Sequence, residues 1–391
     1  MRITNAMLFK TFLTNLGRLQ QDFARYNEQL SSERRINRPS DDPPDMTNLL
    51  ALDQELVRIT RFGENISEAN RRLESTDSRL NEYSLAVTRV IELAEQGSSE
   101  GTAGTGRRAI AEEIRTILDQ LGSIADAKLA DRYLFAGTRT TRNSIPSVPP
   151  GQVFSLATTL EVTGTGTTGG IVVDPTVYEE DLYIIRFTDA AGSYEVVNLD
   201  DDAVVTTGTV AVGAGSIAFE GLQVDYNLAA LPAQGDAWTV QPQYVYNGTD
   251  DHIELQVDEN TKVVQNVLGS DVFGGASGVP GNTVFDELVD LRFALLRDDT
   301  NAIRAGLNTA SNRLDTVSNQ RAKAGGTISN LRNFQLRSNE RTADLLVRKA
   351  EIENVDLAEV ISKLVQTEGG IQAALQAGAR LGQLNLFNFL R

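Results

Sequence analysis

Both ends of this 391-residue chain carry apolar residues that recur alternately three and four positions apart. Such spacing lays one narrow apolar stripe along an α-helix, as in a coiled coil. A narrow stripe cannot be buried by its own helix, so each end needs a second helix to cover it. The other end of the same chain is the nearest partner. The pattern therefore predicts a helical rod that takes part in assembly and argues against a catalytic pocket.

The N-terminal stripe and its C-terminal counterpart together form the candidate assembly interface. It consists of Phe9, Phe12, Leu16, Leu19, Phe23, Tyr26, Leu30, Leu364, Ile371 and Leu381. A further series with the same spacing runs from Ile59 to Ala94. On spacing alone, the core of an intramolecular helical bundle is the favoured interpretation of these stripes. Assembly is favoured at the two ends because neither has a globular core of its own.

The positions of proline divide the chain. All ten prolines lie at 39–44 or 146–280. Because proline interrupts helices, the stretches 45–145 and 281–391 are predicted to be helical arms. Between them, short β-branched and aromatic runs such as 182–187 and 194–199 predict strands joined in a hairpin.

We therefore predict a mainly α fold with an inserted β domain, in which long coiled-coil-like helices from both termini form a rod and a helical bundle. Three regions follow from these boundaries. They are a terminal helical core region of paired helices (1–45 plus 351–391), a helical bundle (46–140 plus 285–350) and an inserted acidic β-rich outer domain (141–284).

Local signals refine this division. Asp42 is predicted to cap a helix that has Pro43 in its first turn, where the missing N–H costs nothing. The Gly/Thr tract at 163–170 is expected to be a loop. The pair Gly325-Gly326 is expected to kink a long helix. Asp41 and Asp42 could also meet arginines of an adjacent subunit.

The net charge of −17 is concentrated in one region. Residues 141–284 contain three basic and nineteen acidic side chains, so the flanking helical arms are close to neutral. Near-neutral faces can pack against copies of themselves, whereas a strongly acidic domain is expected to stay solvated and apart from its neighbours. Without a basic patch, nucleic-acid binding is not expected.

No residue pattern predicts catalysis, a metal site or a cofactor. Cysteine is absent and His252 is the single histidine, so thiolate chemistry and histidine clusters are excluded. The adjacent acids Asp200, Asp201 and Asp202 lack the alternation of a calcium loop. The glycine-rich stretch 101–106 lacks the Gly-Lys-Ser/Thr of a phosphate loop, so a flexible helix connection is expected.

The sequence shows no apolar run that resembles a signal peptide or a membrane span. Composition alone would therefore place the chain in the cytoplasm, unless a dedicated exporter handles it intact. A secreted coiled-coil adhesin, with the β domain as its binding part, is a different class of function. That alternative requires a signal peptide and an anchoring segment.

Three sequence strings resemble the flagellin superfamily, and within it the hook-associated proteins. They are Ile36-Asn-Arg-Pro-Ser-Asp-Asp-Pro43, Asp131-Arg-Tyr-Leu-Phe-Ala-Gly-Thr138 and Asn354-Val-Asp-Leu-Ala-Glu-Val-Ile361. The resemblance covers about 1–140 and 285–391. Residues 141–284 match less specifically, mainly at Gly235-Asp-Ala-Trp-Thr-Val-Gln-Pro242.

This resemblance implies a structural component of the bacterial flagellum at the junction between hook and filament, where it supports flagellin polymerisation. It implies several partners: another hook-associated protein on the hook side, flagellin on the filament side, copies of itself in a ring, and an export chaperone on the C-terminal helix. It also implies an extracellular location reached by type III export without a cleavable signal peptide, and no membrane insertion. A flagellin filament subunit is the alternative within the same architecture.

Overall fold

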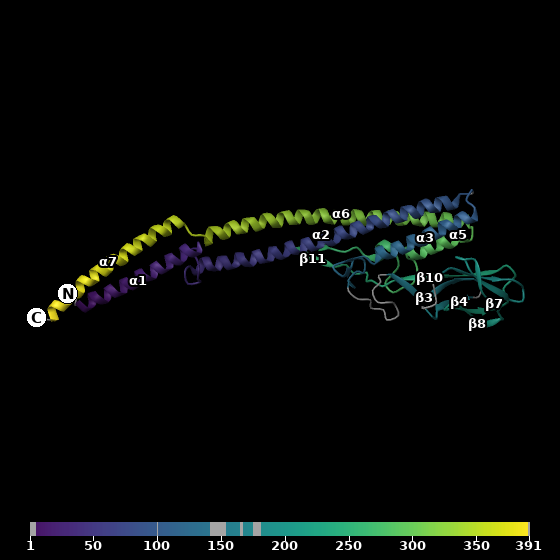
Figure 1. Ribbon diagram of the computed structural model, residues 1–391, viewed down its shortest axis with the longest axis horizontal. Helices are drawn as coiled ribbons and strands as arrows, with labels where there is room; N and C mark the ends of the chain where they lie inside the picture. Colours follow the sequence, from purple (N-terminus) through teal and green to yellow (C-terminus); the bar gives the residue numbers. More distant parts are fainter. Residues whose placement is uncertain (1–4, 100, 141–153, 165–166, 175–180, 390–391) are drawn as a thin grey trace. The chain divides into compact units, whose positions relative to one another are not determined.

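The computed structural model describes residues 5–99, 101–140, 154–164, 167–174 and 181–389. The chain forms two compact units. Unit 1 comprises residues 1–64 and 335–391, and unit 2 comprises residues 65–334. Two long helices, α2 (Pro43–Ser98) and α6 (Thr300–Glu353), contribute residues to both units (Figure 1).

Unit 1 consists of helical segments from both ends of the chain. α1 (Asn5–Ser32) packs against α7 (Leu357–Phe389), and the first part of α2 runs beside the last part of α6. Two ion pairs join α2 and α6 here, Arg341 to Glu55 and Lys349 to Asp53, both at 2.6 Å. The mainly α fold with long helices from both termini is therefore confirmed.

Side-chain caps set where two of these helices begin. The Asp42 carboxylate accepts a hydrogen bond from the Asp45 N–H at 3.3 Å, which confirms the predicted cap of α2. The Asp356 carboxylate accepts from the N–H groups of Ala358 and Glu359 at 2.9 and 3.1 Å, and so caps α7. Each carboxylate satisfies N–H groups that have no partner within the helix.

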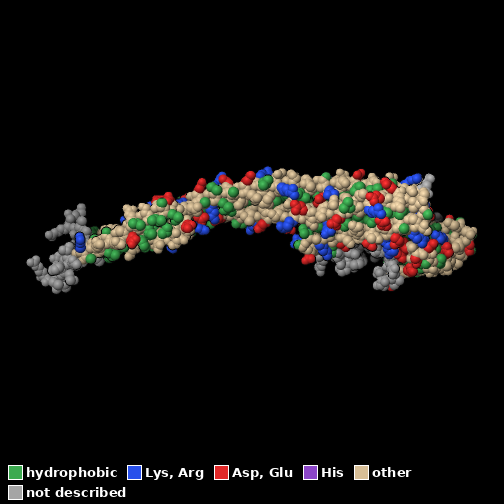
Figure 2. All heavy atoms as spheres, turned by 45° about the horizontal axis from the view of Figure 1, so that its top comes forward, with side chains coloured by type: hydrophobic (Ala, Val, Ile, Leu, Met, Phe, Trp, Pro, Cys, Tyr) green, Lys and Arg blue, Asp and Glu red, His purple; other side chains and the backbone are tan. Residues whose placement is uncertain are grey.

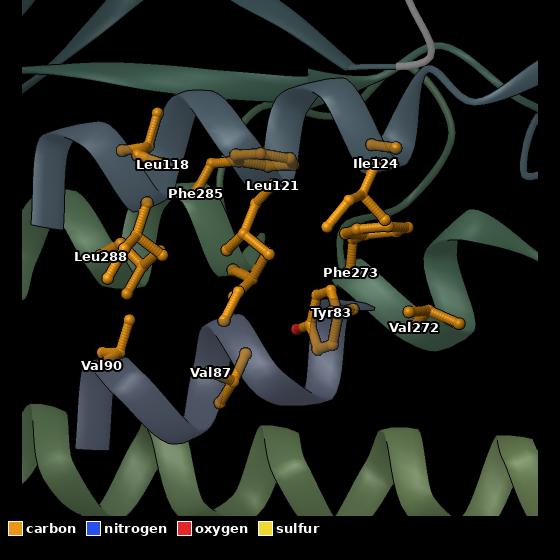
Figure 3. Close-up of a cluster of buried hydrophobic side chains, with 14 of the residues drawn as sticks. Tyr83, Val87, Val90, Leu118, Leu121, Ile124, Val272, Phe273, Phe285 and Leu288 are labelled. Atoms are coloured by element: carbon orange, nitrogen blue, oxygen red, sulfur yellow. The ribbon is translucent and has the colours of Figure 1, made fainter. Parts of the chain in front are cut away.

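The bundle of unit 2 contains α3 (Gly104–Ala125), α5 (Val284–Leu296), the short α4 (Gly269–Phe273) and the adjoining parts of α2 and α6. Its core is aromatic at one end, where Phe273 contacts Tyr83, Phe135 and Phe285 with ring centroids 5.1, 5.3 and 6.1 Å apart. Figure 3 shows Tyr83, Phe273 and Phe285 together with aliphatic side chains from α2 and α3. The stripe predicted along 59–94 therefore faces an intramolecular core.

The β region is an antiparallel sheet of eight strands in the order β7-β6-β5-β10-β3-β4-β9-β8, with two short hairpins beside it. The sheet strands are β3 (Phe154–Thr163), β4 (Thr167–Val172), β5 (Tyr183–Phe187), β6 (Ser193–Asn198), β7 (Ala203–Thr209), β8 (Gly213–Phe219), β9 (Leu222–Leu228) and β10 (Ala237–Tyr246). The hairpins are β1 (Lys128–Leu129) with β2 (Arg132–Tyr133), and β11 (Glu254–Asp258) with β12 (Thr261–Val264).

The eight-stranded sheet has its own core around Trp238, which is 1% exposed. The Trp238 ring lies 4.8 Å from that of Phe187. On the two edge strands, Gly208 and Gly215 lie opposite Tyr194 and Tyr226, and each tyrosine ring covers its glycine. Such aromatic cover replaces the packing that an edge glycine cannot supply.

The β region is docked on the bundle through charge pairs, one of which is buried. Arg292 of α5 is 3% exposed and bonds to Asp200, which is 8% exposed. Arg115 of α3 lies 3.5 Å from Asp181. The expectation that the acidic segment stays apart from its neighbours is therefore wrong for this face, because its carboxylates meet arginines of the bundle.

Apolar packing also crosses from the β region to the bundle. Residues of the β region that belong to the bundle core include Leu182, Ile184, Val197, Leu199, Tyr244 and Tyr246. The boundaries 45, 140, 284 and 350 stay a prediction. In the part of the chain that the structure describes, residues 65–140 and 285–334 of the predicted bundle share one compact unit with the β domain, whereas residues 46–64 and 335–350 belong to unit 1.

One local expectation is wrong, and the expected kink at Gly325-Gly326 stays a prediction. Residues 167–170 of the Gly/Thr tract belong to strand β4 and pair with β9, so the tract is not a loop throughout. The helix α6 passes through Gly325 and Gly326 without a break. A Cβ at either glycine would meet no atom within 4 Å, so packing inside the chain does not require glycine there.

Candidate assembly interface

The two terminal helices form an antiparallel pair in a fixed register. Phe12 of α1 lies against Gly378 of α7, where an added Cβ would come within 2.5 Å of the ring. Leu19 lies against Gly370 one heptad further along, with the corresponding distance 3.5 Å. The N-terminal end of α1 therefore faces the C-terminal part of α7, and the glycines let the helices approach closely.

The predicted interface residues lie along this contact, which we call the terminal seam. Its described members are half-buried: Phe12, Leu16, Leu19, Phe23, Tyr26, Leu30, Leu364 and Ile371. Phe9 and Leu381 belong to α1 and α7, but their side chains lie outside the described residues. The structure thus brings the described members from both ends together within one chain, and whether they also contact another subunit stays a prediction.

The most buried side chains along the terminal seam belong to α7. Val360 is 5% exposed and Thr367 is 8% exposed. The Thr367 hydroxyl donates to the Lys363 carbonyl at 2.6 Å, so its burial leaves no unpaired polar group. On the outer side, a hydrogen bond from the Lys363 ammonium to Glu359 raises the pKa of Lys363.

A second set of apolar side chains on α7, which the sequence analysis did not predict, is exposed to solvent. It consists of Leu357, Ile361, Val365 and Leu375, which are 42%, 48%, 63% and 53% exposed. We call these residues the outer stripe. The repeat of four between its first three members was the signal in the sequence, because it adds a second apolar face to a helix that already has one.

Exposed apolar side chains continue onto the other helices of unit 1. They are Met7 and Leu13 of α1, Leu50 and Val57 of α2, and Leu336, Leu346 and Val347 of α6. Figure 2 shows apolar side chains gathered on one face of the terminal helices, at the left of the view. Exposed apolar side chains that gather in this way are typical of a surface that meets another protein or a membrane.

The described residues offer little for other kinds of site. No group of three or more His, Cys, Asp or Glu among them is placed to hold a metal ion. Within the same residues, no helix combines the length and apolar character that crossing a membrane requires. The acids considered for calcium are engaged elsewhere, since Asp200 pairs with Arg292 and Asp202 lies 3.6 Å from Arg108.

Comparison with known proteins gives a consistent result. Residues 3–140 match the bacterial flagellin N-terminal helical region. Flagellar hook-associated protein 3 of Salmonella typhimurium is 24% identical over 141 residues, which cover 36% of this chain and 44% of that protein. A flagellin of Clostridium tyrobutyricum is 20% identical over 371 residues, which cover 93% of this chain and 94% of that protein.

Among solved structures, a protein described as a flagellar hook-associated protein from Vibrio parahaemolyticus shares the fold. The match has a TM-score of 0.51 at 15% identity, and covers 80% of this chain and 100% of that one. This chain spans less than half the length of the hook-associated relative from Salmonella.

The described residues combine paired terminal helices that carry exposed apolar side chains with a bundle that carries a β region, and residues 3–140 resemble the N-terminal helical region of bacterial flagellins. Flagellar hook-associated protein 3 is among the proteins that the chain resembles, and the match to the flagellin N-terminal region covers about a third of the chain. The family resemblance expected from the strings at 36–43 and 131–138 is confirmed.

Proposed function

We propose that the chain is a structural component of the bacterial flagellum, placed at the junction between hook and filament. The observation that carries this proposal is the exposed apolar surface of unit 1, above all the outer stripe on α7. Residues 3–140 resemble the flagellin N-terminal region, which suggests that this apolar surface is covered by neighbouring subunits in a flagellar assembly. The similarity to hook-associated protein 3 favours the junction over other positions.

The mechanism is burial on assembly. The terminal seam covers one face of each terminal helix, and the outer stripe would be covered by neighbouring subunits. Burying a Val, Leu or Ile side chain gains about 1.5–3 kcal/mol relative to leaving it exposed, so a few such contacts per subunit can offset the entropy of ordering the ends. Copies of this chain would form a ring, with another hook-associated protein on one side and flagellin on the other.

Two further parts of the proposal concern delivery. We infer a location outside the cell, on the flagellum, reached through the flagellar export apparatus. We also infer that an export chaperone binds the C-terminal helix α7 before assembly. The outer stripe of α7 supports this inference, because an apolar face that is exposed before assembly is prone to aggregation unless another protein binds it.

A flagellin filament subunit is the second candidate. It is favoured by the flagellin of Clostridium tyrobutyricum, whose similarity extends over 93% of this chain. The two functions differ in copy number per flagellum. A junction protein is needed for a short ring, whereas a filament subunit is needed in thousands.

Deletion of the gene tests the proposal directly. We expect cells with hooks but without filaments, and unpolymerised flagellin in the culture medium, with filaments restored when the intact gene is supplied. Quantification of the protein in purified flagella then separates the candidates. Normal filaments on the deleted strain, or this chain as the bulk protein of the filament, would contradict the junction role.

A further inference from the structure

The two helix breaks of unit 1 lie side by side. The Arg35 N–H donates to the Glu353 carbonyl at 2.7 Å, and the Val355 N–H donates to the Glu33 carbonyl at 3.2 Å. The linker between α1 and α2 is therefore bridged to the linker between α6 and α7. We call this region the joint, and define it as residues 33–45 and 352–356.

A single side chain connects the helix ends at the joint. Both Nε and Nη2 of Arg35 donate to the Ile352 carbonyl, at 3.2 and 3.1 Å. Nη1 of Arg35 donates to Asp42 at 2.8 Å, and Nη2 also bonds to Asp45. Ile352 lies in the last turn of α6, where carbonyls have no partner within the helix, and the two acids flank the start of α2.

The signs of the charges suit these positions. A cation is favourable at the C-terminal end of α6 and carboxylates are favourable at the N-terminal end of α2. Hydrogen bonding to Asp45 raises the pKa of Arg35, and hydrogen bonding to Arg35 lowers the pKa of Asp42. The planar guanidinium reaches a carbonyl and two carboxylates at once, which the single ammonium of lysine cannot do.

The linker residues that follow Arg35, in the 36–43 string, hold Arg35 in place. The Asp41 carboxylate accepts from the N–H groups of Asn37 and Arg38, at 3.0 and 2.8 Å, which folds the linker into a turn. Ile36 is 5% exposed and anchors the linker in the packed interior. Gln29 of α1 donates to the Arg35 carbonyl at 2.7 Å. The acids of this string, considered as contacts for another subunit, are thus engaged within the chain.

We propose that Arg35 is a clamp that closes the end of the α2/α6 pair, so that α1 and α7 can order or disorder without fraying α2 and α6. The side chain of the clamp bonds to groups of α2 and α6, and its backbone is held by the linker together with one hydrogen bond from Gln29 of α1. Its bonds therefore survive when the terminal seam opens. This inference concerns the joint alone and does not depend on the proposed place in the flagellum.

Hydrogen–deuterium exchange of the full-length protein tests the clamp. In Arg35→Gln we expect amides at 46–58 and 342–353 to exchange about tenfold faster, because bonds to a charged group are lost at both helix ends. Arg35→Lys should give nearly the same acceleration, because an ammonium cannot bridge the three acceptors. Amides at 110–124 in unit 2 should keep their exchange rates, which shows that the variants fold.

Two further variants separate the clamp from its surroundings. Arg38→Gln is the matched control, because Arg38 lies in the same linker but pairs with Glu28 of α1 at 3.1 Å. It should leave 46–58 and 342–353 unchanged. Leu16→Asp opens the terminal seam, and should accelerate exchange in α1 and α7 alone. The proposal is overturned if Arg35→Gln leaves both segments as in the wild type, or if Leu16→Asp accelerates them as much as Arg35→Gln does.

Discussion

The two compact units differ in how far their apolar side chains are buried. Unit 2 buries two large clusters of aromatic and aliphatic side chains, whereas the buried hydrophobic residues in the described part of unit 1 are Ile36, Leu49, Ile59, Leu345 and Val360. Eleven of the eighteen exposed large hydrophobic side chains in the described residues belong to unit 1, although unit 2 contains more than twice as many residues. Unit 2 therefore buries its core within a single chain, and we expect unit 1 to gain burial from neighbouring subunits.

The largest expected effect breaks the core of unit 2. Phe273 is fully buried among three aromatic rings, so Phe273→Ala should lower the free energy of unfolding by about 3–5 kcal/mol. Urea denaturation followed by circular dichroism measures the change. Leu375→Ala, which removes a 53% exposed side chain of unit 1, is the control and should be close to neutral in the free protein. If both variants lost the same free energy of unfolding, the two units would not differ in how much their apolar side chains contribute to stability.

The next effect falls on the terminal seam. Leu16→Asp places a carboxylate in a half-buried helix contact, where an unpaired charge is strongly unfavourable. We expect a soluble, exported protein with an intact unit 2 that is lost to the medium, with flagellin left unpolymerised. Gln20→Asp, at an exposed position of the same helix, should be nearly silent. Normal filaments with Leu16→Asp would show that the terminal seam is not needed for assembly.

The outer stripe offers a cleaner separation of folding from assembly. Val365 is 63% exposed in the free chain, so Val365→Asp should leave stability and helicity unchanged. In the assembly the substitution forfeits about 1.5–3 kcal/mol of side-chain burial and adds a charge to an apolar contact. Sedimentation of in vitro assemblies should show impaired assembly, whereas the exposed control Gln366→Asp should assemble normally. If both variants assemble alike, the outer stripe is not an interface.

The smallest effect concerns the two glycines inside α6. Gly326→Ala should raise the free energy of unfolding by about 1 kcal/mol, because glycine is a poor helix former and an added methyl group meets nothing. Thermal denaturation measures the gain. A variant that is more stable yet assembles poorly would reveal that this face of unit 2 also contacts a neighbour. Unit 2 would then not be complete in a single chain.

Much of the helical part of the fold could be predicted because periodicity and proline are local signals. The stripe at 59–94 and the cap at Asp42 are examples. The docking of the β region could not be predicted. It depends on Asp200 meeting Arg292, 92 positions further along the chain, and a local count of acidic residues suggested repulsion instead. Net charge describes a region, whereas docking depends on which side chains face each other.

The candidate site shows the same limit. The terminal seam could be read from its spacing, since a heptad series marks one face of a helix whatever covers it. The outer stripe was not predicted, although Leu357, Ile361 and Val365 repeat every four residues, because spacing alone does not say which apolar side chains the partner helix leaves exposed. Whether either surface contacts another subunit stays a prediction.

The aromatic cluster of unit 2 has a consequence for folding kinetics. Tyr83, Phe135 and Phe273 are far apart in the sequence yet pack against one another. Long loops must therefore close before the core gains its stability, and topologies of this kind fold slowly. Until α4 and α5 reach α2 and α3, the apolar faces of those helices stay open to solvent and to other chains. The time during which the chain is vulnerable to misassembly is thus set by the distance in sequence between its helical arms.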